Sequence, residues 1–426
     1  MPIKVNIKSN VLKYVLILSS GTLLAQTVSY LLAPIISRIY VQEEYGELDL
    51  FIKIVSFGAT LASARYEMSL PKIHGVVPAF RLYKFIFRIA FYIVLFSVVF
   101  VSIYAFFLKD SSSLLFVLLI PLGIVLLLFY NIGTNWSIRQ KLFKHISYSK
   151  ITNTMSSGIL KIVLGKLHFG YLGLIYSVLI GFFLSNFWYL KEYIKTNKRY
   201  KIKTKSPRNY LIAVKNKDFP LVNLPHTLME LGKDLLIALI IIELFTMSEF
   251  GSYAFTFRML RIPLVLVGVS ISQVFLQKCS ENYNLGKDLK PILLKSVKTL
   301  TLISIVPFTI IFFYGQEIFI FVFSDTWSEA GEYAEIMAPW FMINLLSSPI
   351  SSLPIVINKQ KEFFKICIVG AIIMSLNFYI PSVLFQADLK TTLMIVSYTQ
   401  AAFLIYVIFA LFNFLKKPTN DIKNVK

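Results

Sequence analysis

Long apolar windows recur along the whole chain of 426 residues, and they restrict its possible folds more than any other feature. About twelve windows of about 20 mostly apolar residues occur, the length that an α-helix needs to cross the hydrocarbon core of a membrane. The composition, with 56% hydrophobic residues and 38 Phe, lies far outside that of soluble domains. We therefore predict an all-α integral membrane protein with about twelve spans. Their expected centres are Leu23, Val55, Ser97, Ile124, Met155, Ser177, Leu231, Leu264, Ile303, Leu345, Met374 and Ile405.

The basic residues predict how these spans are oriented. Most of the 43 Lys and Arg residues fall in alternate connections, beginning with the N-terminal segment, while acids are concentrated in the other connections. Because cytoplasmic connections carry an excess of Lys and Arg, both termini are expected to be cytoplasmic. This bias, together with attraction to anionic lipid headgroups, accounts for the net charge of +21 without a nucleic-acid partner.

A weak internal repeat predicts two halves. A shift without gaps places Ala33 on Ala238, Glu44 on Glu249, Gly46 on Gly251 and Lys53 on Arg258. A basic turn also recurs, as Arg139 to Phe143 and as Lys359 to Phe363, at the same place in each half. We expect an N-terminal six-helix bundle over residues 1–195, a basic cytoplasmic linker over 196–219 and a C-terminal six-helix bundle over 220–426. Such pseudo-symmetric halves place the ligand in a central cavity at their interface.

Charged side chains occur deep within several predicted spans, where each costs about 2.5 to 3.5 kcal/mol to insert. Arg258 and Arg261 lie three residues apart, hence on one helix face near the middle of the membrane. Lys53 and Lys233 occur in spans with a polar stripe along their length. The cations in the spans outnumber the acids, which favours an anionic ligand such as a phosphate, because Arg binds phosphate through paired hydrogen bonds.

Structural roles remain open for the same residues. Lys53 with Asp49, and Glu230 with Lys233, have the spacing of local ion pairs on a helix. Pairing with an acid of the preceding helix is the alternative for the two arginines. For Arg65, at the inner end of the second span, the alternative is contact with lipid phosphates. Lys161, a turn from an outer helix end, is predicted to extend its ammonium group to water.

Four segments of the chain follow one another in a recognisable order. They read PIISRIYVQEEYG from Pro34 to Gly46, RYEMSLP from Arg65 to Pro71, YAFTFRMLRIPLVLVGVSISQVFLQ from Tyr253 to Gln277 and FSDTWSEAGEYAEIMAPW from Phe323 to Trp340. In this order the chain resembles, over nearly its whole length, the polysaccharide exporters of the multidrug, oligosaccharidyl-lipid and polysaccharide (MOP) superfamily, of the O-antigen flippase type.

The resemblance implies a function and a set of site residues. It implies translocation of an undecaprenyl-pyrophosphate-linked repeat unit, for O-antigen or another surface polysaccharide, across the bacterial inner membrane by alternating access. The implied partners are the lipid-linked oligosaccharide, membrane lipids, and a polysaccharide polymerase with its chain-length machinery. Pyrophosphate contacts are expected from Arg258, Arg261, Lys53, Lys233, Arg38 and Arg65. Polar cavity-lining residues are expected to be Gln26, Asn223, Ser56 and Thr60. Coupling to H⁺ or Na⁺ is expected at Glu230 and Asp234, with the membrane potential as the alternative energy source.

Two other functions are weighed against this one. A drug or cation antiporter of the same superfamily would have an acidic or aromatic cavity, whereas the charged residues here are mostly basic. A membrane polymerase or transferase would need a catalytic cluster, but His74, His145, His168 and His226 are scattered over different segments. No metal-ligand spacing and no phosphate-cradling glycine loop is present in the sequence, so neither catalysis nor a metal or other cofactor is expected.

Overall fold

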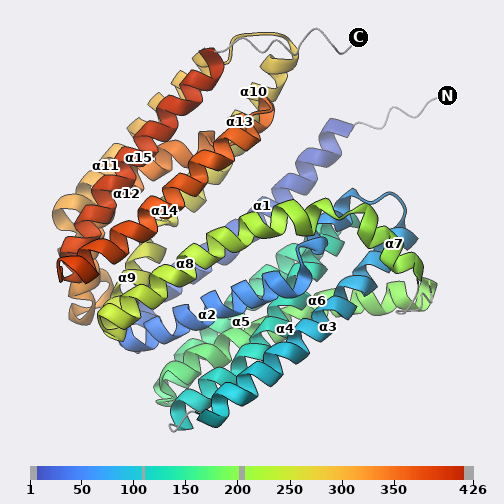
Figure 1. Ribbon diagram of the computed structural model, residues 1–426, viewed down its shortest axis with the longest axis horizontal. Coiled ribbons are helices and arrows are strands. Elements are labelled where there is room, and N and C mark those ends of the chain that lie inside the picture. The colour runs from blue at the N-terminus through green and yellow to red at the C-terminus, as the bar shows by residue number, and fades with distance from the viewer. Residues whose placement is uncertain (1–6, 108–110, 201–206, 417–426) are drawn as a thin grey trace. The chain divides into compact units, whose positions relative to one another are not determined.

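The computed structural model describes residues 7–107, 111–200 and 207–416, and within these ranges the regular structure is helical, with no strand (Figure 1). Each expected span centre lies in a helical segment. The prediction of an all-α protein is therefore confirmed. The chain divides into two compact units, residues Met1–Leu235 and Leu236–Lys426.

The first unit consists of the N-terminal helices and the first half of α8 (Leu224–Leu244), because the boundary between the units falls inside that helix. It contains α1 (Ile7–Ser37), α2 (Gln42–Ser63), η1 (Tyr66–Lys72), α3 (Val76–Phe107), α4 (Ser111–Arg139), α5 (Phe143–Lys166), α6 (Gly170–Tyr200), α7 (Pro207–Lys215), η2 (Phe219–Asn223) and the start of α8. The division thus falls beyond residues 196–219, the linker expected from the sequence. Residues 201–206 of that linker lie outside the described ranges.

The second unit follows within α8. It contains α9 (Met247–Leu260), η3 (Leu264–Gly268), α10 (Val269–Asn284), α11 (Lys290–Phe323), η4 (Asp325–Trp327), α12 (Ser328–Ile350), α13 (Leu353–Val356), α14 (Gln360–Leu384) and α15 (Leu389–Lys416). α12 is the centre of this unit, because α9, α10, α11 and α15 all pack against it. Its residues Tyr333, Met337 and Phe341 are fully buried as a result.

Eight helical segments in the described part of the chain are long and apolar enough to cross a membrane. They are Val76–Val99, Leu114–Arg139, Gly170–Tyr200, Met247–Gly268, Lys290–Phe323, Asp325–Val356, Gln360–Leu384 and Leu389–Leu415. The other expected spans are α1, α2, α5 and α8. Charged side chains lie inside α2, α5 and α8 and reduce their apolar character. These three helices are therefore not among the eight apolar segments above.

Helix packing in the first unit brings α2, α4 and α5 against α6, while α1 packs against α5. A buried aromatic cluster joins α3, α4 and α6: the ring centroids of Phe80 and Trp136 lie 5.5 Å apart, as do those of Tyr83 and Tyr193. Such pairs contribute about 0.5–1.5 kcal/mol each beyond the burial of their area. These contacts hold α3, α4 and α6 together in the first unit.

Small residues allow α1 and α5 to approach closely. A Cβ atom on Gly21 of α1 would lie 2.4 Å from Ser147 Cβ, and one on Gly158 of α5 would lie 2.4 Å from Leu32 Cδ1. Glycine is needed at Gly21, because the added atom would meet Ser147 down to its Cα, whereas at Gly158 only the tip of the Leu32 side chain would have to shift. Close packing around small residues is a usual way for helices to associate in a membrane.

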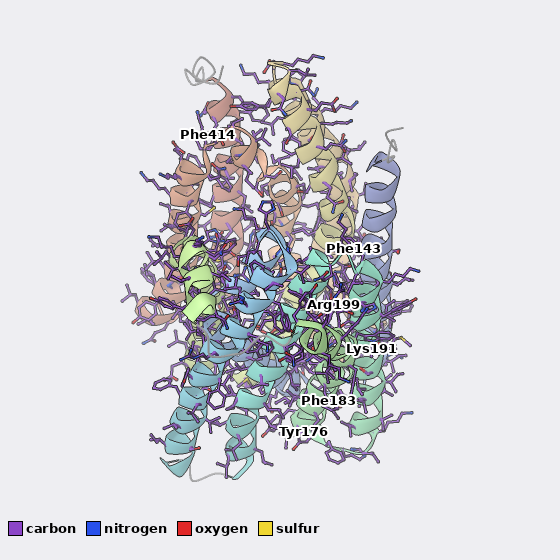
Figure 2. The ribbon with its side chains drawn as sticks, turned by 90° about the vertical axis from the view of Figure 1, so that its right-hand side faces the viewer. Phe143, Tyr176, Phe183, Lys191, Arg199 and Phe414 are labelled. Carbon is purple, nitrogen blue, oxygen red and sulfur yellow. The ribbon has the colours of Figure 1, made fainter. Side chains whose placement is uncertain are left out.

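α5 and α6 run in opposite directions. Figure 2 shows Phe143, at the start of α5, toward the same end of the first unit as Lys191 and Arg199 of α6, while Tyr176 of α6 lies toward the other end. This arrangement gathers basic residues at one end of the helix pair.

Candidate functional site

The two copies of the internal repeat begin their helices in the same way. The Glu249 carboxylate accepts a hydrogen bond from the Thr246 backbone N–H at 3.0 Å, and Thr246 Oγ1 accepts one from the Glu249 N–H at 3.1 Å, which caps α9. At α2, Glu44 accepts a hydrogen bond from the Val41 N–H at 2.9 Å, and Val41 offers no side-chain acceptor in return. Glu44 and Glu249 coincide in the repeat because both satisfy a free donor at a helix start.

α2 carries the first predicted cation. Lys53 forms an ion pair with Asp49, one turn earlier on the same helix, and both side chains are partly exposed. Ser56 is half-buried, and Thr60 is buried, with its backbone carbonyl accepting a hydrogen bond from Ser63 Oγ at 3.1 Å. The structure thus contains the local ion pair that the sequence offers as the alternative for Lys53.

Arg65 lies where α2 ends. Ala64 and Arg65 both have positive φ, so the chain leaves the helix there and turns into η1. Arg65 Nη1 lies 3.4 Å from Glu67 Oε1, and the Glu67 side chain is 2% exposed. Burial raises the pKa of the Glu67 carboxyl, while hydrogen bonds and the positive charge of Arg65 act in the opposite direction. Arg65 is therefore the counter-charge of a buried acid.

α8 carries three charged side chains over less than two turns. Lys233 Nζ lies 3.2 Å from Asp234 Oδ1, so Lys233 pairs with its neighbour in the sequence. Glu230 is exposed, as is Asn223, whose carbonyl accepts a hydrogen bond from Thr227 Oγ1 at 2.9 Å. Glu230 and Asp234, the residues expected to couple an ion, lie one turn apart on this helix.

Arg258 and Arg261 lie at the end of α9. The helix buries Phe250 to Thr256 together with Met259 and Leu260, and both arginines are exposed. The Arg261 guanidinium lies over the Phe257 ring, 5.5 Å from its centroid. Both cations also occupy the end of the helix whose dipole favours positive charge. The two side chains therefore lie on the surface of the second unit.

Three other residues named from the sequence lie on or next to α1 and α5. Arg38 is exposed in the turn between α1 and α2, and Gln26 is half-buried on α1. Lys161 is 8% exposed, so the prediction that it extends to water is wrong. The end of α5 is covered by the chain after α1, where Tyr40 donates a hydrogen bond to the Lys161 carbonyl at 2.8 Å.

Sequence reasoning did not include Lys150. Lys150 lies two turns inside α5, which begins at Phe143, and within the apolar window expected around Met155. Its ammonium group donates a hydrogen bond of 2.9 Å to Thr22 Oγ1 of α1. A lysine inside this apolar window was the available signal for a functional residue. Among the described residues, no group of His, Cys, Asp and Glu side chains suits a metal ion.

The fold is similar to that of several solved membrane transporters. The structure is similar to that of the lipid II flippase MurJ in an inward closed conformation. The TM-score is 0.72, the sequence identity is 14%, and the match covers 94% of this chain and 89% of MurJ. An inward-facing multidrug resistance MATE transporter has a TM-score of 0.68 and 11% sequence identity, and the match covers 92% of this chain and 94% of the transporter. A MOP superfamily transporter from Pyrococcus furiosus has a TM-score of 0.58 and 12% sequence identity, and the match covers 95% of each chain. The fold is that of MOP superfamily membrane transporters.

The amino-acid sequence shows the family of the protein. The chain matches the family model described as polysaccharide biosynthesis protein over residues 35–332, and it belongs to that family. No curated protein sequence matches it. The resemblance to polysaccharide exporters is therefore confirmed at the level of the family, and the fold is one found in MOP superfamily transporters.

Proposed function

We propose that the protein is a flippase that moves a polyprenyl-pyrophosphate-linked oligosaccharide from the cytoplasmic to the outer face of a bacterial inner membrane by alternating access. The oligosaccharide is a repeat unit of O-antigen or another surface polysaccharide. Membership of a polysaccharide biosynthesis family with a transporter fold supports this function.

The excess of positive charge in the helices is the observation that carries the proposal. Lys53 is paired with Asp49, and Lys233 with Asp234, so these acids balance cations of their own helices. The two arginines of α9 are exposed at the end of a helix and add a positive surface. A pyrophosphate supplies the matching negative charge and accepts several hydrogen bonds from guanidinium groups.

The remaining parts of the proposal concern energy and partners. The membrane potential, negative inside, favours outward movement of an anion by about 2.3 kcal/mol per charge per 100 mV. Glu230 and Asp234 are the proposed sites for H⁺ or Na⁺ if an ion contributes as well. We further propose that both termini are cytoplasmic, and that a polysaccharide polymerase with its chain-length machinery receives the exported unit.

The sidedness of the accumulated intermediate tests this function. A deletion strain is expected to accumulate the lipid-linked repeat unit on the cytoplasmic face of the inner membrane, where a membrane-impermeant glycosidase or lectin does not reach it in spheroplasts. Complementation with the wild-type gene is the control. Accumulation of single repeat units on the outer face would refute the flippase and favour a polymerase, because translocation would then be intact.

An antiporter for drugs or cations is the second candidate, favoured by the similarity to the MATE transporter fold. Its ligand would be a lipophilic cation, and the positive charges of α9 disfavour such a ligand. Binding of a short-chain polyprenyl diphosphate by the purified protein is therefore compared with binding of tetraphenylphosphonium. Tighter binding of the phosphonium cation would replace the flippase with the antiporter.

A further inference from the structure

A cation inside the first unit has a neutral partner. Lys150 on α5 is half-buried, and its ammonium group donates a hydrogen bond of 2.9 Å to the hydroxyl of Thr22 on α1. This contact lies in the close packing of the two helices, one position from Gly21, which touches Ser147. Lys150 is therefore held between two helices.

The helices around Lys150 supply almost no negative charge. α5 itself contains no Asp or Glu residue, and neither do α1 and α4, which pack against it, while α6, also packed against it, contains only Glu192. Among the described residues, Lys150 forms no ion pair. An ammonium group in a partly dehydrated site is costly without a counter-charge, and a hydroxyl does not provide one.

A second donor lies on the same face of α5. Asn153 is three residues after Lys150, the spacing of adjacent positions on a helix. The Nδ2 amide of Asn153 is buried and has no hydrogen-bond acceptor among the described residues. An ammonium group and an unused amide donor, one turn apart, are suited to a ligand that is negatively charged and accepts several hydrogen bonds.

The depth of this pair within α5 indicates from which side a ligand reaches it. Lys150 is seven residues after Phe143, about 10 Å along the helix at 1.5 Å per residue. With the proposed topology, Phe143 lies at the cytoplasmic end, so Lys150 lies in the cytoplasmic part of the membrane. On α1, Gln26 and Ser29 follow Thr22 at helical spacing, and both are half-buried.

We propose that Lys150, positioned by Thr22 and assisted by Asn153, binds the diphosphate of the lipid-linked substrate on the cytoplasmic side of the first unit. This inference rests on the proposed function, and it adds a binding residue to a helix that the sequence did not implicate. The chemistry of the site is recognition of a diphosphate ester.

Binding of farnesyl diphosphate to the full-length protein in a neutral detergent tests the proposal by calorimetry. K150Q, which retains a similar length without the charge, is expected to bind about tenfold more weakly, whereas K150R retains most of the affinity. T22V, which removes the acceptor that positions the ammonium group, is expected to give a smaller loss. K166Q changes an exposed lysine of the same helix and is the matched control.

The outcomes separate this proposal from the general function. If the wild type binds farnesyl diphosphate and K150Q binds as tightly as K166Q, the Lys150 site is refuted while the flippase stands. If the wild type does not bind, both proposals are refuted. Binding of phosphatidylglycerol is measured in parallel, and an equal loss of both ligands in K150Q would assign the site to lipid headgroups and overturn the proposal. If K150Q does not fold, T22V and K150R decide: undiminished binding in T22V together with lost binding in K150R would contradict the proposed geometry.

Discussion

Replacing Arg65 by Met distinguishes a structural role of this arginine from a role in substrate binding. Glu67, its partner, is 2% exposed, and Arg65 is 25% exposed, so the pair is largely removed from water. Removing one member of a buried ion pair costs about 3–5 kcal/mol. We expect about 3 kcal/mol for R65M, the lower end of the range, because hydrogen bonds to Ser63 and to the backbone still serve the carboxylate. For a unit of this size, that loss lowers the midpoint of thermal unfolding by about 6–12 °C.

The dependence of this effect on pH follows from the pKa of Glu67. Burial raises the pKa of its carboxyl, so the folded protein holds the proton more tightly than the unfolded chain, and Glu67 contributes less stability as the pH rises through its folded pKa. Arg65 opposes this loss by stabilising the ionised form. The destabilisation by R65M should therefore be largest at alkaline pH and become smaller as the pH falls and Glu67 is protonated in both proteins.

The double variant R65M/E67Q provides the control. It removes the buried charge together with its partner, so its unfolding midpoint should recover most of the loss and show little of the pH dependence of R65M. Unfolding is followed by differential scanning fluorimetry of the purified protein in detergent, and export by complementation of the deletion strain. An R65M protein as stable as wild type would refute the structural account. A double variant that is stable but exports nothing would show that Arg65 contacts the substrate.

Three further predictions concern other parts of the chain. T246A should lower stability by about 1 kcal/mol in chemical unfolding, because it removes the cap of α9; an unchanged midpoint would contradict the capping role. G165V should displace Tyr40, whose ring would lie 2.8 Å from the added Cβ, and lower the yield of folded protein on size-exclusion chromatography, while normal yield would show that the turn adapts. The double variant R258A/R261A should fold normally, since both side chains are exposed, yet lose export in the complementation assay, and undiminished export would exclude both from the site.

Residues matched by the internal repeat can have the same role in both halves or lie in different environments. Glu44 and Glu249 could be matched from sequence alone, and their common helix-capping role explains the match. Lys53 and Arg258 were matched as well, but the structure gives Lys53 an ion pair on its own helix and leaves Arg258 exposed. A pattern therefore located these cations but did not distinguish their environments, because an environment depends on neighbouring side chains.

Hydrophobic periodicity and length determined the class of this protein: spans of about 20 apolar residues have to form helices in a membrane, where every backbone polar group needs an internal partner. The order of its motifs determined the family. The tertiary structure decided which charged residues are balanced and which are not, because Glu67 beside Arg65, and Thr22 beside Lys150, are contacts set by chain turns and helix packing. Helical spacing relates residues of one helix, whereas the charge balance of a site depends on contacts between helices that no local pattern specifies.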